Sequence, residues 1–314
     1  MADKARKLLL EDPALKNLRP QLEFVSRNWR DLTPALTSLS CESVGGKKEE
    51  TYDVSLAMCL MHLSFYIWDD MLDNARCKSF KPTFFGKFGA SNALVVGGLA
   101  SAKAFLILND VNLKSETSQT VTKLIWNLWT KMAKGETVTK GSRTLTSKFW
   151  KIKMEAADTE TCFRLGAIVG NGSKNEIDHL AKCGHYLGVV SSLWNDFWVS
   201  INLTLELSEK IRSGRLPCTL LWSCSKSKPL RTKIENLANN EAIEQTCLKE
   251  IVQEILATGA LEYVTRRITS YSEKAKKELL CLKRNNAVQT LESFVGFQPR
   301  LFIDSVSMVQ ASRT

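Results

Sequence analysis

The chain has 314 residues, of which 44% are hydrophobic and 24% charged, and its formal net charge is +10. This composition is typical of a globular protein and excludes a disordered chain, a collagen and a small disulfide scaffold. The positive charge favours an anionic partner. Because no block of basic residues interleaved with aromatic residues occurs, we do not expect nucleic-acid binding.

The sequence also indicates where in the cell the protein is located. The first residues carry charges of both signs and lack the apolar core of a signal peptide. The longest apolar stretches, 54–68 and 93–108, are shorter than the ~20 residues of a membrane span. The nine Cys form no CxxC pair, which argues against a zinc ribbon or a disulfide framework. We therefore expect a cytoplasmic protein with no transmembrane segment.

Apolar residues recur at helical spacing along most of the chain. The segments with this pattern are 8–22, 54–71, 90–108, 121–132, 145–170, 179–205 and 251–282. No Pro occurs from residue 83 to residue 216, which favours long helices. Short turn-like segments connect the helical ones, and no long Ser-rich or Pro-rich linker separates them. We predict a single all-α domain over residues 1–314.

Three carboxylates follow the apolar segment 54–68 directly. On a helix, Asp69, Asp70 and Asp73 point toward one region, and like charges at these spacings repel one another. A cation would relieve the repulsion, and Mg²⁺ is commonly held by one or two carboxylates together with substrate phosphates. The alternative interpretation is a charged helix end that is exposed to water.

A second polar pair follows another apolar run. Asn195 and Asp196 come after residues 187–193, so they place oxygen ligands against a hydrophobic wall. Two such sites in one helical bundle predict facing helices that share a metal-binding cavity. Taken alone, an Asn-Asp pair is more often a helix cap or a turn.

In these two motifs and in further segments, the sequence resembles the trans-isoprenyl diphosphate synthases and the class I terpene synthases that share their fold. The matching segments run in order from about residue 30 to residue 220. They are His62 to Asp70, Lys81-Pro82-Thr83 with Phe88-Gly89, Gly135-Glu136, Leu165-Gly166-Ala167, Gly184 to Gly188, and Gly214-Arg215-Leu216-Pro217.

The resemblance implies the isoprenoid synthase fold, a single antiparallel helical bundle around a central cavity, and a homodimer. It also implies that Asp69, Asp70, Asp73, Asn195 and Asp196 bind about three Mg²⁺ ions, which grip an isoprenyl diphosphate substrate. The three aspartates of the first motif would then be the catalytic residues. Metal ions and cationic side chains would stabilise the departing pyrophosphate while an apolar cavity excludes water.

Further side chains are implied to bind the substrate. Cationic and polar contacts to diphosphate are expected from Arg30, His62, Arg76, Lys78, Lys153 and Arg215. Phe65, Trp194 and Trp198 are expected to line the cavity, because aromatic faces stabilise cations. In the resembling family, bulk four residues before the first Asp limits the growing isoprenoid chain, so Phe65 implies a short chain, of about 10 to 20 carbons.

Some residues depart from the family pattern. The site for isopentenyl diphosphate needs a Gly-Lys-Arg and Arg-Pro region and an Arg pair after DDxxD, but here Thr33 replaces one cation and Lys78-Ser79-Phe80 replaces the Arg pair. In the second motif, Asn195 replaces the first Asp and Val199 the third.

These departures leave several functions open. The leading hypothesis is a Mg²⁺-dependent class I terpene synthase, which ionises one allylic diphosphate and lets the cation cyclise or react with water. The alternatives are a short-chain trans-prenyltransferase that condenses an allylic diphosphate with isopentenyl diphosphate, and a non-catalytic partner subunit of a prenyl synthase.

Overall fold

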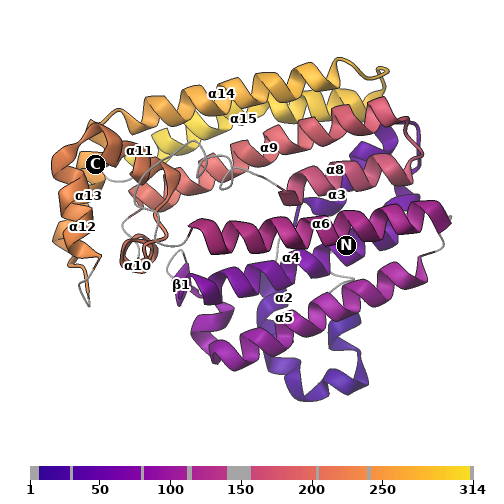
Figure 1. Ribbon diagram of the computed structural model, residues 1–314, viewed down its shortest axis with the longest axis horizontal. Helices are drawn as coiled ribbons and strands as arrows, with labels where there is room; N and C mark the ends of the chain where they lie inside the picture. The colour runs from indigo at the N-terminus through magenta and orange to yellow at the C-terminus, as the bar shows by residue number, and fades with distance from the viewer. Residues whose placement is uncertain are drawn as a thin grey trace. The chain divides into compact units, whose positions relative to one another are not determined.

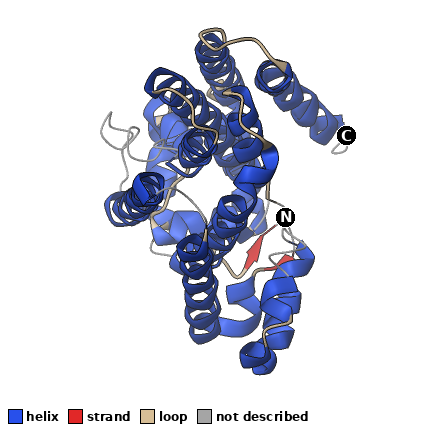
Figure 2. Cartoon of the chain, turned by 90° about the vertical axis from the view of Figure 1, so that its right-hand side faces the viewer, coloured by secondary structure: helices blue, strands red, loops and turns tan. Residues whose placement is uncertain are grey.

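A computed structural model describes residues 7–28, 31–78, 81–111, 115–139, 157–202, 205–238 and 242–311. Apart from one short hairpin, the regular elements in these ranges are helices, coloured blue in Figure 2. The predicted all-α class is confirmed. Three helices between residues 83 and 216, namely α5, α6 and α9, have 27, 25 and 28 residues, as the absence of Pro predicts.

The elements follow one another in this order. They are η1 (Pro13–Leu18), α2 (Arg19–Asn28), α3 (Thr33–Ser43), η2 (Lys48–Thr51), α4 (Tyr52–Leu72), β1 (Cys77–Lys78), β2 (Lys81–Pro82), α5 (Phe84–Asp110), α6 (Ser115–Thr139), α8 (Ala157–Val169), α9 (Lys174–Ile201), α10 (Leu205–Ser213), α11 (Cys218–Lys226), α12 (Lys228–Leu237), α13 (Gln245–Ala257), α14 (Ala260–Leu279) and α15 (Asn286–Ala311).

The chain divides into two compact units. The first comprises residues 1–127 and 161–178, and the second comprises residues 128–160 and 179–314. Helices α6, α8 and α9 contribute residues to both units. The single domain over residues 1–314 stays a prediction.

The first unit is built around α4, which packs along α5 (Figure 1). Helix α4 is apolar on nearly all sides, and its residues from Val54 to Met61 are buried, as is typical of a central helix. The two helices approach closely at Gly97, where a Cβ atom would lie 2.3 Å from Nε1 of Trp68. Nearby, Ser64 Oγ donates a 2.7 Å hydrogen bond to the carbonyl of Gly97 and accepts one from Ser101.

Helix α4 ends in a turn that fixes the direction of the following chain. Asn74 has a φ of +55°, and Asn is one of the few residues other than Gly that adopt this left-handed conformation readily. The Ala75 N–H donates to the Asp70 carbonyl at 2.8 Å, and the Asn74 N–H donates to the Met71 carbonyl at 3.1 Å. This pattern is a Schellman motif, which satisfies the last helical carbonyls and leads into β1.

The hairpin of β1 and β2 was not expected from the sequence. The strands pair antiparallel, with Cys77 opposite Pro82 and Lys78 opposite Lys81. Each strand has two residues, so it gives no detectable two-residue alternation in the sequence.

The second unit has a core of its own. Its buried side chains come from α9 to α15, and Phe302 of α15 is fully buried against Trp194 and Phe197 of α9. Helices α14 and α15 pack along each other (Figure 1). The described residues 225–238 and 242–311 are helical over most of their length, and the predicted segment 251–282 falls largely within α13 and α14.

Helix α5 has the length and composition of a membrane-spanning helix, with a mean hydropathy of 1.6 in its most apolar window, of which 33% is buried. The apolar stretch 93–108 is thus part of a longer helix, and the length argument against a membrane span does not hold for it. A core helix of a soluble protein has the same properties, so the absence of a transmembrane segment stays a prediction.

The close approach at Gly97 gives a first prediction. Replacing Gly97 by Val should lower the free energy of unfolding by about 1–3 kcal/mol, because the new side chain overlaps the indole of Trp68. Urea denaturation measures the change. Gly98→Ala is the matched control, since nothing lies within 4 Å of a Cβ atom there, and it should not destabilise the protein. Equal stability of Gly97→Val and the wild type would contradict this packing.

Candidate active site

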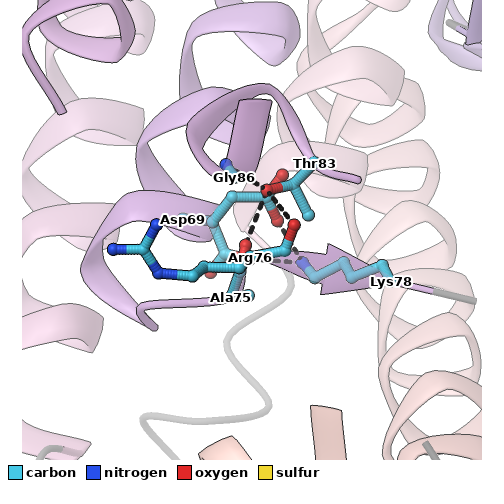
Figure 3. A network of polar contacts seen from close by, with 7 residues as sticks. Asp69, Ala75, Arg76, Lys78, Thr83 and Gly86 are labelled. Atoms are coloured by element: carbon cyan, nitrogen blue, oxygen red, sulfur yellow. Dashed lines mark hydrogen bonds and ion pairs between the residues drawn. The ribbon is translucent and has the colours of Figure 1, made fainter. Parts of the chain in front are cut away.

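The first aspartate motif holds a cation that belongs to the chain itself. Nζ of Lys78, in β1, lies 2.6 Å from Oδ1 of Asp70 and 3.2 Å from Oδ2 of Asp69 (Figure 3). The Asp70 side chain is completely buried, whereas that of Asp69 is 45% exposed and that of Lys78 22% exposed. Asp73 is buried as well. The alternative of a fully exposed charged helix end is therefore wrong.

Burial dominates the electrostatics of Asp70. Loss of hydration raises the pKa of its carboxyl to about 6, although the ammonium of Lys78 lowers it, and the charges of Asp69 and Asp73 add to the increase. The three carboxylates therefore affect one another, as the spacing predicts. This arrangement favours any cation that reaches the buried end of the motif.

Thr83 fixes the base of the hairpin that carries Lys78 (Figure 3). Its hydroxyl donates a 2.6 Å hydrogen bond to the carbonyl of Ala75 and accepts one from the N–H of Gly86, so it caps the N-terminus of α5. Its N–H donates to the carbonyl of Arg76. Gly86 lies against that carbonyl so closely that a Cβ atom could not fit. The backbone of residues 75, 76 and 83–86 is therefore firmly held.

The residues of the first motif fit part of a magnesium site. Among the described residues, no group of three His, Cys, Asp or Glu side chains is close enough to hold an ion. However, Asp69 and Asp70 already bind the ammonium of Lys78 between them, and one or two carboxylates with substrate phosphates are the usual ligands of Mg²⁺. Such an ion would supply Lewis-acid stabilisation of a leaving diphosphate.

His62 lies in a different polar cluster, with Asp31 and Thr33. Its Nδ1 is 2.8 Å from Oγ1 of Thr33 and 3.5 Å from Oδ1 of Asp31. Burial raises the pKa of Asp31, but hydrogen bonds and charge from His62 and hydrogen bonds from Thr33 lower it further, so that it lies below its usual value. An anionic group therefore stands beside a residue that the family resemblance assigns to a diphosphate.

The contact of Asp31 with His62 was not expected from the sequence. Its Oδ1 accepts hydrogen bonds from both the N–H and the hydroxyl of Thr33. Asp followed two residues later by Thr is a signal for this local turn, in which the Asp side chain bonds the backbone two residues on. This local signal does not indicate the contact with His62, because His62 lies 29 residues after Thr33 in the sequence.

The second motif has a structural task in the second unit. Oδ2 of Asp196 accepts a 2.8 Å hydrogen bond from the N–H of Cys218, the first residue of α11. Asp196 is buried, whereas Asn195 is exposed. Ser200, which is buried, donates to the carbonyl of Asp196. Asp196 therefore caps α11 at its N-terminus, where a negative charge is also favoured by the helix dipole.

The aromatic candidates lie in apolar surroundings. The ring of Trp194 packs edge-on to that of Phe302, at 5.3 Å between centroids, and Trp198 contacts Phe197 at 6.0 Å. Both Trp side chains are partly buried against the core of the second unit, whereas Phe65 is partly buried in the first. A cavity-lining role for these three stays a prediction.

The remaining cationic candidates differ in their surroundings. Arg76 is exposed, and its guanidinium lies 5.2 Å from the ring centroid of Phe85. Arg215 follows α10, where Gly214 has a φ of +68° and the Arg215 N–H donates to the carbonyl of Lys210. Arg30 and Lys153 lie outside the described residues.

Comparisons with known proteins identify the family of this chain. The family model of polyprenyl synthetase matches residues 18–255, about three quarters of the chain. The chain belongs to the polyprenyl synthetase family. The predicted resemblance and the prediction of an isoprenoid enzyme are thereby confirmed.

Curated relatives and solved structures agree with this assignment. The chain is 23% identical to a geranylgeranyl diphosphate synthase of Methanosarcina mazei, over 83% of this chain and 82% of that protein. It is 22% identical to a short chain isoprenyl diphosphate synthase of Methanothermobacter thermautotrophicus, over 89% of each. A crystal structure of geranylgeranyl pyrophosphate synthetase from Pyrococcus horikoshii has a TM-score of 0.82 at 19% identity, covering 95% of this chain and 94% of that one. The last likeness confirms the isoprenoid synthase fold.

The cap on α11 gives a prediction for Asp196. Replacing Asp196 by Ala should lower the free energy of unfolding by about 1–2 kcal/mol in the absence of any divalent metal, because the N–H of Cys218 loses its acceptor. Thermal unfolding in EDTA measures this. Asn195→Ala is the matched control, as Asn195 is exposed and should have a small effect. An unchanged stability of Asp196→Ala in EDTA would contradict the stabilising role of this cap.

Proposed function

We propose that the chain is a Mg²⁺-dependent enzyme that ionises a short allylic isoprenyl diphosphate at its first aspartate motif. The observation that supports this best is the buried Asp70, which shares a cation with Asp69 at the end of the apolar helix α4. Burying a carboxylate costs free energy unless the charge is paired or binds a metal, and carboxylates with shifted pKa values are typical of catalytic metal sites.

Each group of site residues has a separate role in this proposal. Asp69, Asp70 and Asp73 hold Mg²⁺ at the diphosphate, with Asn195 and Asp196 as the proposed second set of ligands. Arg76, Lys78, Lys153 and Arg215 are the proposed cationic contacts to the diphosphate oxygens, which gain charge as the carbon–oxygen bond breaks. The half-buried Phe65 is placed four residues before Asp69, where its ring would limit the length of the isoprenoid chain.

For the fate of the allylic cation, we propose condensation with isopentenyl diphosphate, as in a short-chain trans-prenyltransferase. The names of the relatives support it: a geranylgeranyl diphosphate synthase and a short chain isoprenyl diphosphate synthase are matched over more than four fifths of this chain. The departures from the family pattern favoured a terpene synthase, whereas the relatives favour chain elongation.

The terpene synthase remains the second candidate because of the cluster around His62. A site for a second diphosphate must be cationic, but Asp31 lies 3.5 Å from His62 and Thr33 replaces a cation. A terpene synthase needs no such site. A non-catalytic partner subunit is the third possibility, and absence of turnover would identify it.

One assay separates these candidates. The protein is incubated with Mg²⁺ and geranyl, farnesyl or geranylgeranyl diphosphate, with and without isopentenyl diphosphate, and the products are analysed by mass spectrometry. We expect longer diphosphates only when isopentenyl diphosphate is present. Hydrocarbons or alcohols formed without it would mean a terpene synthase instead.

The matched variants are Asp69→Asn and Asp70→Asn, which keep the shape of each side chain and remove its charge. Either should lower kcat at least about 100-fold, because a charged metal ligand is lost. Asp53→Asn, at the exposed first turn of the same helix, should leave the rate unchanged. Full activity of both motif variants would refute the metal site.

We also propose that the chain forms a homodimer through α5. Leu94, Val95, Phe105 and Leu106 are exposed apolar residues of this helix. Residues eleven apart lie on one helical stripe, so Leu94 and Phe105 share a face that Val95 and Leu106 widen. An apolar face of this kind favours burial against a protein surface.

Replacing Leu94 and Phe105 together by Glu should convert the homodimer to a monomer, because two charges would be buried in the interface. Light scattering after size-exclusion chromatography measures the mass. The double variant Lys123→Glu, Lys134→Glu, at exposed positions of α6, controls for added charge. A wild-type chain that is monomeric at micromolar concentration would contradict the proposal.

A further inference from the structure

Lys78 bridges Asp69 and Asp70, the two carboxylates that the proposed function assigns to a metal ion. Its ammonium contacts the buried carboxylate at 2.6 Å and the half-exposed one at 3.2 Å. A metal ion cannot bind the same carboxylate oxygens while the Lys78 ammonium contacts them. The two positive charges would lie so close together that they repel strongly in a poorly hydrated site. The metal and Lys78 therefore exclude each other at this pair.

Lys78 can leave the carboxylates without a change of fold. The backbone on both sides of the hairpin is held by Thr83 and by the close contact of Gly86 with Arg76. The lysine stem has four rotatable carbon–carbon bonds, and its side chain is partly exposed. The exposed Tyr66 ring, whose centroid lies 5.4 Å from Nζ, already makes a cation–π contact that does not depend on the carboxylates.

We propose that Lys78 competes with the metal: its ammonium offsets part of the charge of Asp69 and Asp70 in the metal-free protein and is displaced when the ion arrives with a diphosphate. The proposal rests on the proposed function, since it takes these aspartates as the metal ligands. A metal alone must break the ion pair and leaves the ammonium without an anion. A metal accompanied by pyrophosphate supplies that anion, so the two bind cooperatively.

The test is metal binding by the intact, metal-free protein. Mn²⁺ is titrated alone and its free concentration is followed by electron paramagnetic resonance. Replacing Lys78 by Met removes the ammonium and keeps most of the side-chain volume. We expect Mn²⁺ to bind Lys78→Met about tenfold more tightly than the wild type. With Mn²⁺ saturating, inorganic pyrophosphate should bind the same variant more weakly, because the released ammonium is missing.

Three further variants make the result specific. Lys81→Met removes the same charge from the partner strand, opposite Lys78, and should change the affinity for Mn²⁺ by less than about twofold. Lys78→Arg keeps the charge and should keep the weak binding of Mn²⁺. Lys78→Gln, checked for its helical circular dichroism, repeats the test should Lys78→Met fail to fold.

Two unfavourable outcomes are distinguishable. If Asp69→Asn and Asp70→Asn bind Mn²⁺ as well as the wild type, the ion does not use these carboxylates and the proposed function loses its metal site. If those variants lose the ion but Lys78→Met binds it no more tightly than Lys81→Met, the metal site stands and the competition by Lys78 is overturned.

Discussion

The structure of the first unit depends on one constraint, the complete burial of the Asp70 carboxylate at the end of an apolar helix. A buried charge needs a partner, and here the partner comes from the next element of the chain. The Schellman turn at Asn74 reverses the chain, and the hydroxyl of Thr83 holds the hairpin against α5, so that Lys78 reaches back to the helix end. The hairpin of β1 and β2, which was not expected from the sequence, therefore places the Lys78 ammonium beside the buried Asp70 carboxylate.

Much of the fold could be predicted because its signals are local. A helical period of apolar residues and a long interval without Pro are read within one segment, and they predicted the long helices correctly. The aspartate spacing likewise predicted three interacting carboxylates. The pairings of Lys78 with Asp70 and of Asp31 with His62 join different elements, and no spacing rule in one sequence indicates which ionic groups meet.

Asp196 shows a second limit of reasoning from the sequence. An aspartate that follows an apolar run can ligate a metal or cap a neighbouring helix, and both tasks require a buried carboxylate with fixed oxygens. The structure shows the cap on α11 through the N–H of Cys218. One oxygen of the carboxylate is engaged there, so a metal role would have to use the other oxygen or break this bond.

The two polar clusters of the first unit differ in how many acids they contain, and this difference bears on the chemistry. At Asp69 and Asp70, acids gather around one cation, which suits a site that gains metal ions. Among the described side chains at His62, one acid with a lowered pKa accompanies one imidazole, so this pair carries no net positive charge even when the imidazole is protonated. A second diphosphate would need additional cations there to offset Asp31. The geometry therefore supports the proposed ionisation of an allylic diphosphate better than it supports the proposed addition to a second diphosphate.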